Sequence, residues 1–219
     1  MFIGHFAVGL AAKRVAPTLS LATLFAAAQL ADILWPFFLA AGLEQVQVTD
    51  NPNPLLRLVF ISYPYSHSLV FLIIWGALLG FAWRARTRSP NAAAVLVLLV
   101  VSHWILDFVT HRPDMPLYPG SAKVGLGLWE SPLLTVAIEI PLYLAGVVIY
   151  AGNTRARDRI GSWGFWALAV FLLILYVASF TGPPPPSLPA LYGSVIASSL
   201  LLLAWSWWAD HHRNPVLRS

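Results

Sequence analysis

The chain has no cysteine and few charged side chains, and both shortages limit what it can be. Charged residues make up 10% of its 219 residues, whereas a soluble globular domain has roughly 25%. Without cysteine, disulfide bonds, thiolate nucleophiles and thiolate metal ligands are excluded, so a metal would have to be held by His, Asp or Glu. Because 58% of the residues are hydrophobic, the composition excludes an ordinary soluble domain and indicates an integral membrane protein.

The basic residues do not indicate a nucleic-acid partner. Thirteen Lys and Arg contribute to a net charge of +4, but they fall in short loops between apolar runs rather than together on one soluble face. No cleaved signal peptide is predicted either, because Lys13 and Arg14 follow the first apolar stretch instead of preceding it.

Six apolar runs are long enough, or nearly long enough, to cross a bilayer, which takes about 20 residues. They are residues 19–43, 66–83, 92–110, 132–152, 163–181 and 188–209. A shorter segment, residues 2–12, precedes them and predicts a half-helix, a re-entrant element or an interfacial helix. The predicted fold class is therefore all-α: a polytopic transmembrane bundle of about six spanning helices plus a short N-terminal half-helix, forming one domain over residues 1–219.

The basic side chains are distributed unevenly between the two sides of the predicted bundle. Alternate loops and the C-terminal tail hold most of them, namely Lys13, Arg14, Arg84, Arg86, Arg88, Arg155, Arg157, Arg159, Arg213 and Arg218. The opposite loops hold only Arg57, Arg112 and Lys123. Because positively charged loops tend to stay in the cytoplasm, the first side, and the C-terminus with it, is predicted to be cytoplasmic.

Ionisable side chains inside the apolar runs are costly and usually face a bundle interior or a water-filled cavity. Asp32 lies four residues before Pro36, which cannot donate a hydrogen bond to the carbonyl of Asp32, so a kinked polar site is predicted there. His103, Asp107 and His111 follow one another at intervals of four residues and therefore lie along one helix face.

Depth places several of these groups at a similar level. His67 opens the second run, Glu139 lies in the fourth, and His5 and Asp32 lie at comparable distances from a turn near Pro17. Positions calculated from the rise per residue of a helix place these groups, together with the helix face of His103 and Asp107, in the non-cytoplasmic half of the bundle. The convergence predicts a divalent cation site, with zinc as the best match, built from imidazole and carboxylate ligands with an open position for water. The predicted ligands are His5, Asp32, His67, His103 and Asp107, with Glu139 and His111 as an accessory base or outer partner.

Each of these residues also has a purely structural interpretation. His5 could make an interfacial contact and His67 could cap a helix, while the buried acids and the other imidazoles could be hydrogen-bonded clamps between helices. His211 and His212 stand among charged residues near the C-terminus and are predicted to be solvated.

Four motifs follow one another in the order Gly4-His5, Asp32, Tyr65-Ser-His-Ser68 and Ser102-His-Trp-Ile-Leu-Asp-Phe-Val-Thr110. In this order the chain resembles, over roughly its first 150 residues, bacterial inner-membrane proteins grouped as metal-dependent hydrolases, including LexA-regulated, membrane-bound hydrolase-like proteins; it looks like a divergent subgroup. The resemblance implies that the five predicted ligands occupy the family's polar positions. It also implies a site-bearing core over residues 1–152, with two additional transmembrane helices in residues 153–219.

Departures from the family pattern limit what the resemblance implies. The family has a second acid and a His after its first Asp, where this chain has Leu34 and Trp35. An Arg-Gly pair is replaced by Pro64 and Tyr65, which removes a cation that could have held a phosphate. One metal ion is therefore predicted rather than two, and phosphoester specificity does not follow.

The leading hypothesis is a membrane-embedded, metal-dependent hydrolase acting on a lipid or lipid-linked ester at the outer leaflet of the inner membrane. Its predicted partners are membrane lipids, and no oligomeric state is indicated. The alternative is a transporter or a proton or ion pathway, because intramembrane carboxylates and His chains also relay protons; the lack of an evident internal repeat argues mildly against it. A third possibility is a scaffold in which the polar cluster only locks helices together.

Overall fold

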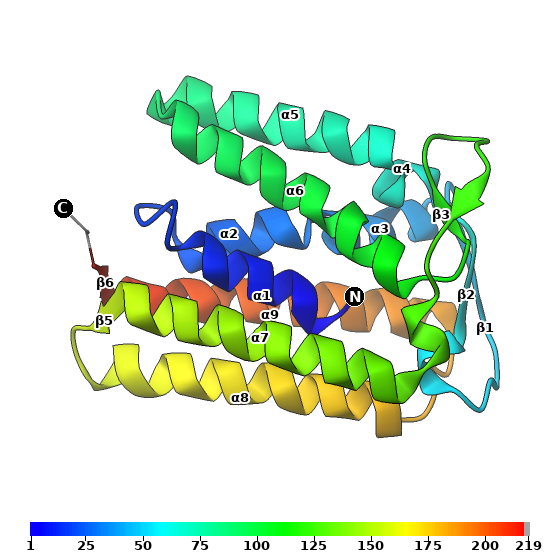
Figure 1. Cartoon of the computed structure of the whole chain (residues 1–219). Helices are drawn as coiled ribbons and strands as arrows, with labels where there is room; N and C mark the ends of the chain where they lie inside the picture. Colours follow the sequence, from blue (N-terminus) through cyan, green and yellow to red (C-terminus); the bar gives the residue numbers. More distant parts are fainter. Residues whose placement is uncertain (217–219) are drawn as a thin grey trace.

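The computed structural model describes residues 1–216, and almost all of its regular structure is helical (Figure 1). The helices are α1 (Ile3–Ala12), α2 (Leu21–Ala28), α3 (Leu30–Ala40), α4 (Pro64–His67), α5 (Leu69–Thr87), α6 (Pro90–Thr110), α7 (Pro132–Asn153), α8 (Arg159–Thr181) and α9 (Leu188–His211). Two 3₁₀ turns, η1 (Pro54–Leu56) and η2 (Leu128–Glu130), lie in the connections. Three antiparallel ribbons pair β1 (Gln45–Val48) with β2 (Leu58–Ser62), β3 (Met115–Pro116) with β4 (Lys123–Val124), and β5 (Thr154–Ala156) with β6 (Arg213–Pro215). The predicted all-α class is confirmed.

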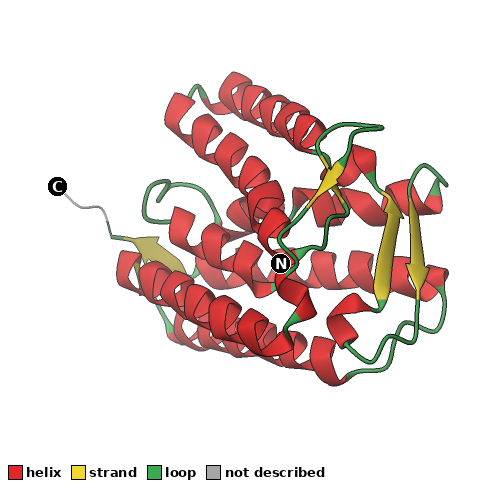
Figure 2. Cartoon of the chain, turned by 45° about the vertical axis from the view of Figure 1, so that its right-hand side comes forward, coloured by secondary structure: helices red, strands yellow, loops and turns green. Residues whose placement is uncertain are grey.

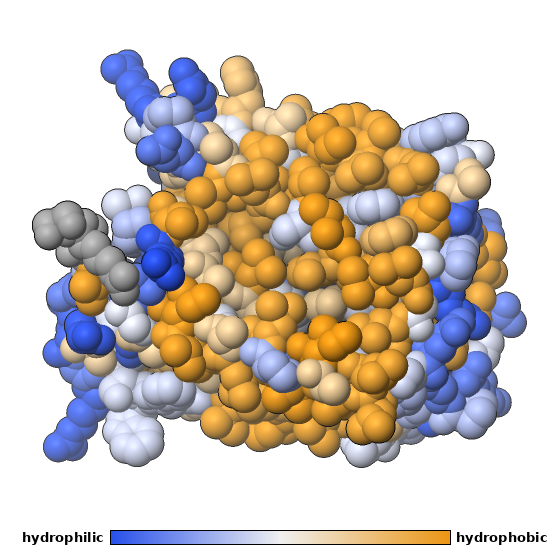
Figure 3. Space-filling view, in the orientation of Figure 1, coloured by the Kyte–Doolittle hydropathy of each residue, from blue (hydrophilic) through white to orange (hydrophobic). Residues whose placement is uncertain are grey.

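Within the described residues, the five helices from α5 to α9 are each long and apolar enough to cross a membrane. The pair α2 and α3 qualifies as a sixth span only when taken together, because a bend of 55° separates the two helices. The space-filling view shows a broad apolar band between two more polar ends (Figure 3). The predicted count of about six spans is thus confirmed, and one of the six is broken.

Side-chain caps decide where the long helices begin. Each helix from α5 to α9 follows a residue whose side chain accepts a hydrogen bond from a backbone N–H in the first turn. These capping residues are Ser68, Ser89, Ser131, Asp158 and Ser187. Such caps satisfy donors that have no partner within the helix. Hydropathy does not register them, so α6 begins at Pro90 rather than at residue 92, and α8 at Arg159 rather than at residue 163.

The break between α2 and α3 lies at Gln29 and not at Pro36, where the sequence analysis placed the kink. Gln29 has φ −104° and ψ 12°, which are not helical values, whereas Pro36 lies inside α3. At the break, the carbonyl oxygen of Ala28 accepts a hydrogen bond of 2.8 Å from Nδ1 of His103 on α6. A side chain that inserts into the backbone ladder is a known cause of kinks, and no local sequence pattern shows it.

The predicted N-terminal half-helix is present as α1, which lies in the middle of the bundle. Its ten residues extend only about 15 Å. α1 lies between α6 and α7 in Figure 1 and packs against α2 as well. Phe6 and Leu10 of α1 belong to an apolar core that includes Tyr143 of α7 and Phe165 of α8. The 45° view also places the N-terminus among the helices (Figure 2), and Met1 is buried.

Gly146 allows α1 and α7 to approach closely. A Cβ atom at this position would lie 2.6 Å from the carbonyl oxygen of Ala7, which is too close for van der Waals contact. Gly146→Ala is therefore expected to lower the free energy of unfolding by about 1–3 kcal/mol, the typical cost of overpacking, and so to lower the thermal midpoint in detergent. Gly152→Ala is the matched control on the same helix, because no atom from another described segment lies within 4 Å of its Cβ position. The control should keep or slightly raise the midpoint; an equal loss in both variants would contradict the packing role of Gly146.

The connections that carry most basic residues gather at one end of the bundle. The α1–α2, α5–α6 and α7–α8 connections and the C-terminal β6 all lie on the left of Figure 1. The β1–β2 and β3–β4 ribbons and the α8–α9 connection lie at the opposite end. Arg218, which was counted with the basic side, lies outside the described residues. That the basic end faces the cytoplasm stays a prediction.

A buried ion pair ties this basic end together. Nζ of Lys13 lies 2.7 Å from Oδ2 of Asp210, and both residues are more than nine-tenths buried. Asp210 also accepts hydrogen bonds from the Tyr150 hydroxyl at 2.6 Å and from the backbone N–H of Leu21 at 3.0 Å. Four segments of the chain therefore meet at one carboxylate.

The two His residues after Asp210 differ in exposure. His211 is exposed, as predicted for a solvated residue. His212 is half-buried, with Nδ1 2.7 Å from Oδ2 of Asp158, the capping residue of α8.

Candidate metal centre

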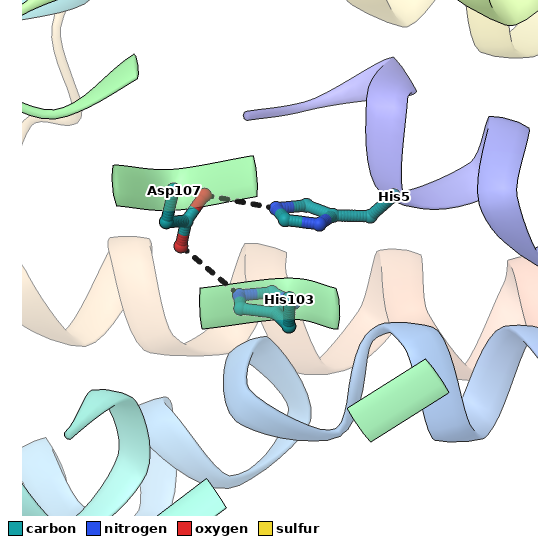
Figure 4. A group of neighbouring side chains, drawn as sticks. All are labelled: His5, His103 and Asp107. Carbon is teal, nitrogen blue, oxygen red and sulfur yellow. Dashed lines mark hydrogen bonds and ion pairs between the residues drawn. The ribbon is translucent and has the colours of Figure 1, made fainter. Parts of the chain in front are cut away.

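Three side chains from α1 and α6 meet inside the bundle (Figure 4). Nε2 of His5 lies 3.0 Å from Oδ1 of Asp107, and Nε2 of His103 lies 3.2 Å from Oδ2 of the same carboxylate. The two imidazole rings stack with 3.7 Å between their centroids and 5° between their planes. The amino group of Met1 also contacts Asp107. Because all three side chains are buried, their polar atoms have little access to bulk water.

Asp32 and His67 extend this group on the side of α3 and α4. Nε2 of His67 lies 3.4 Å from Oδ1 of Asp32 and 3.9 Å from Oδ2 of Asp107. Nε2 of His103 lies 3.8 Å from Oδ1 of Asp32. Two sets of three side chains therefore each have ligand atoms close enough to hold a metal ion: His5, His103 and Asp107, and Asp32, His67 and His103. The fold thus brings together all five residues that the sequence analysis proposed as ligands.

Three imidazoles, on α4, on α6 and on the residue that follows α6, are each held by a contact at Nδ1. Nδ1 of His103 donates to a backbone carbonyl of α2. Nδ1 of His67 lies 2.7 Å from Oγ of Ser66, and Nδ1 of His111 lies 2.9 Å from Oδ1 of Asp114. Such contacts fix the ring and leave Nε2 facing the carboxylates, the arrangement typical of His residues that bind metals.

Glu44 supports His67 through Ser66, and it was not among the residues predicted from the sequence. Its Oε1 accepts hydrogen bonds of 2.8 Å from the backbone N–H groups of Tyr65 and Ser66, and its Oε2 accepts one of 2.7 Å from the Ser66 hydroxyl. Ser66 thus gives its proton to Glu44, and its oxygen can accept the Nδ1 proton of His67. A lone acid directly after an apolar run looks like a loop residue. Only its pairing with residues 65 and 66 distinguishes it, and that pairing is long-range.

His111 forms a second supported pair at the edge of the cluster. Asp114, which contacts His111, also accepts a hydrogen bond of 2.9 Å from the Tyr63 hydroxyl. Burial, reinforced by nearby Asp114, raises the pKa of Tyr63 well above its ordinary value, so the hydroxyl keeps its proton and remains a donor. Nε2 of His111 lies 3.9 Å from Oδ2 of Asp107.

Glu139 lies on α7 and lines a neighbouring cavity. Its Oε2 accepts hydrogen bonds from the backbone N–H groups of Phe2 at 3.0 Å and Gly4 at 3.4 Å. Its Oε1 has no hydrogen-bond partner among residues 1–216. The neighbouring cavity, of about 310 Å³, is also lined by Arg57 and Tyr176. Of the two proposed accessory residues, His111 therefore lies with the cluster, and Glu139 lies next to it.

A cavity of about 170 Å³ opens beside the cluster. Its lining combines the polar residues His5, Asp32, His67, Asp107 and His111 with the aromatic residues Phe2, Trp35, Phe60 and Trp129. This space is large enough for water molecules and a small reacting group. Trp35, which replaces a His of the family pattern, thus forms part of the cavity wall.

A comparison with protein families places the chain in a known family. The model of the YdjM inner membrane protein family matches residues 1–183. The chain belongs to the YdjM inner membrane protein family. The YdjM match covers α1 to α8 and every residue of the cluster, whereas α9 begins after it. With its spanning helices, this YdjM protein is a multi-pass inner-membrane protein. No curated protein and no solved structure matches the chain.

Proposed function

We propose that this YdjM protein is a membrane-embedded, metal-dependent hydrolase that acts on a lipid or lipid-linked ester near the non-cytoplasmic leaflet. The observation that carries the proposal is the orientation of His67 and His103. Both imidazoles direct Nε2 at carboxylate oxygens 3.2–3.9 Å away, while Nδ1 contacts a group outside the cluster. These imidazole nitrogens and carboxylate oxygens come from three separate chain segments, α3, α4 and α6.

The hydrogen bonding of His103 supports a cation between these side chains. Because its Nδ1 proton goes to the carbonyl of Ala28, the neutral ring presents a lone pair at Nε2. That lone pair lies 3.2 Å from Oδ2 of Asp107, yet Nε2 has no hydrogen-bond partner among the described residues. Two acceptors that face each other repel, and a cation would turn both into ligands. Imidazole nitrogens combined with carboxylate oxygens suit zinc.

The shared position of His103 favours one ion rather than two. His103 belongs to both sets of possible ligands, but only its Nε2 faces them, so it can bind one ion at a time. The remaining imidazoles and carboxylates can complete three or four protein ligands and leave a position for water, as in catalytic zinc sites.

Hydrolysis needs an activated water and a group that moves its proton. A bound divalent cation would lower the pKa of a water and polarise the carbonyl or phosphoryl oxygen of a substrate. His111 is placed to accept the water proton at Nε2, because Asp114 holds its Nδ1, as a third group orients many general bases. The water oxygen bonds to the ester carbon, the bond to the leaving oxygen breaks, and His111 returns the proton to that oxygen. Glu139 is the alternative base.

Metal content and lipid hydrolysis test the proposal together. Protein purified in detergent should contain about one equivalent of zinc per chain, as expected for a mononuclear site, by elemental mass spectrometry. In mixed micelles it should release fatty acid from a fluorescent phospholipid or diacylglycerol. Chelation should abolish this activity, and added zinc should restore it. Protein that binds no divalent cation, even after incubation with zinc, manganese or magnesium, would overturn the proposal.

Ser66 offers a test of the support behind the ligands. Ser66→Ala removes the hydroxyl that links His67 to Glu44 but removes no proposed ligand. Zinc affinity should therefore fall by about 10–100-fold, the usual effect of losing an outer partner. Competitive titration with a chelating dye measures this affinity. Ser102→Ala is the matched control, because Ser102 also precedes a cluster His but donates its hydroxyl to the carbonyl of Leu99. Equal affinities in both variants would show that Ser66 does not support the site.

A proton or ion pathway is the second candidate, and the break between α2 and α3 favours it. Interrupted spanning helices often surround transport sites, and Asp32 lies in the first turn after the break. In liposomes, the wild-type protein should then dissipate a proton gradient faster than Asp32→Asn. Flux equal to that of empty liposomes, together with zinc-dependent hydrolysis, would decide for the enzyme.

A further inference from the structure

An apolar groove adjoins the candidate metal centre, between the broken pair α2–α3 and α9. The groove has a volume of about 180 Å³, and its apolar lining includes Phe6, Phe25, Ile33, Val195, Leu202 and Leu203. Ser198 and Ser199 of α9 also line it. Phe2, Asp32 and Trp35 line both this groove and the cavity beside the cluster. An occupant of the groove can therefore reach the proposed ligands directly.

Asp32 is the proposed ligand that is accessible from this groove. Its side chain is 40% exposed, whereas the side chains of the other four proposed ligands are at most 4% exposed. A carboxylate in a membrane-spanning segment is costly unless a polar partner or water reaches it. The groove thus presents a carboxylate where it adjoins the cavity beside the cluster, and mostly apolar side chains elsewhere.

Two buried polar atoms in the groove wall indicate that its occupant is amphipathic. Oε1 of Gln29 and Nε1 of Trp35 have no hydrogen-bond partner among the described residues, although both residues are more than nine-tenths buried. Buried polar atoms are normally paired. The Trp35 N–H can donate to an ester carbonyl, the group found where a lipid's acyl chain meets its headgroup, and the Gln29 oxygen can accept from a hydroxyl.

We infer that the groove binds the hydrocarbon chain of a lipid that enters sideways from the bilayer, with its ester group at Asp32 and Trp35. This inference rests on the proposed hydrolase function and adds the binding mode of its substrate. Two of its walls, α9 and the broken pair α2–α3, are long and apolar enough to cross a membrane, so the acyl chains of a bilayer would surround them. α9 forms one wall of the groove, although it lies beyond the residues matched by the family model. The fit of the groove to the lipid's hydrocarbon chain therefore depends on a helix outside the matched region.

Photolabelling with a lipid tests the groove independently of catalysis. The probe is phosphatidylglycerol with a diazirine in the middle of one acyl chain, mixed into phosphatidylethanolamine vesicles that contain the full chain. After illumination, peptide mass spectrometry should find label at groove positions such as Ile33 and Val195. Ser199→Trp should abolish this label by filling the groove from α9. Leu200→Trp is the matched control, because Leu200 is 64% exposed on the same helix and does not line the groove.

The double variant His103→Ala with Asp107→Ala separates the groove from the metal centre. Groove labelling that persists in this variant but disappears in Ser199→Trp supports the inference, even if no metal-dependent hydrolysis is found. Labelling confined to outward-facing positions such as Leu201, or unchanged in Ser199→Trp, overturns it, even if hydrolysis is found. Ser198→Trp serves as a second blocking variant if Ser199→Trp does not fold.

Discussion

His103→Ala is expected to weaken zinc binding by more than the roughly 100-fold that loss of an outer partner can cause. The reason is that His103 belongs to both sets of possible ligands, so neither set is complete without it. The rate of lipid hydrolysis by the His103→Ala variant should fall to that of the metal-free protein. Isothermal or dye-based titration with zinc, followed by elemental analysis of the desalted protein, measures the change.

His211→Ala provides the comparison, because it removes an imidazole that is exposed and far from the cluster in sequence. It should keep the metal content and the activity of the wild type. His103→Ala also removes the hydrogen bond to Ala28, so its thermal midpoint should be recorded alongside. A folded His103→Ala protein that retains a full equivalent of tightly bound zinc would rule out the proposed ligand set.

Asp210→Ala is expected to cost about 3–5 kcal/mol of stability, the usual result of removing one partner of a buried ion pair. The ammonium of Lys13 would be left buried without its carboxylate, and the Tyr150 hydroxyl and the Leu21 N–H would lose their acceptor. The measurement is unfolding in detergent, by heat or by denaturing detergent, relative to the wild type. Zinc binding in the protein that remains folded should be unaffected, because neither Lys13 nor Asp210 belongs to the sets of possible ligands.

Two further variants make this prediction specific. Asp50→Ala removes an exposed aspartate and should leave stability nearly unchanged. Lys13→Met combined with Asp210→Leu should recover much of the loss, because replacing both partners of a buried pair by apolar residues is often neutral or stabilising. If Asp210→Ala unfolds no more easily than Asp50→Ala, the pair does not hold the basic end together.

The helices and the approximate position of the polar site could be predicted because both depend on local rules. Apolar runs near bilayer length mark spans, and a spacing of four residues places His103 and Asp107 on one helix face whatever surrounds them. The rise per residue along each helix then predicted that the His and Asp residues lie at a similar depth in the membrane.

The remaining features depend on contacts between residues far apart in the chain. Glu44 supports His67 through Ser66, and Asp210 pairs with Lys13 across 197 positions. The break at Gln29 coincides with a hydrogen bond from a side chain of α6. None of these contacts has a local signature, and in each case the nearby sequence suggested something else: a loop acid, a solvated tail and a proline kink.

The short α1 has a consequence for how the protein is made. A helix of about 15 Å cannot cross the bilayer alone, and α7 holds it through Glu139, which accepts from Phe2 and Gly4, and through the close approach at Gly146. His5 precedes α7 in the chain, and the contacts with Glu139 and Gly146 that hold its helix can therefore form only after α7 has been inserted. A nascent chain ending at α6 would contain all five proposed ligands but lack these contacts, so we expect α1 to be held firmly beside α6 only when α7 is in place.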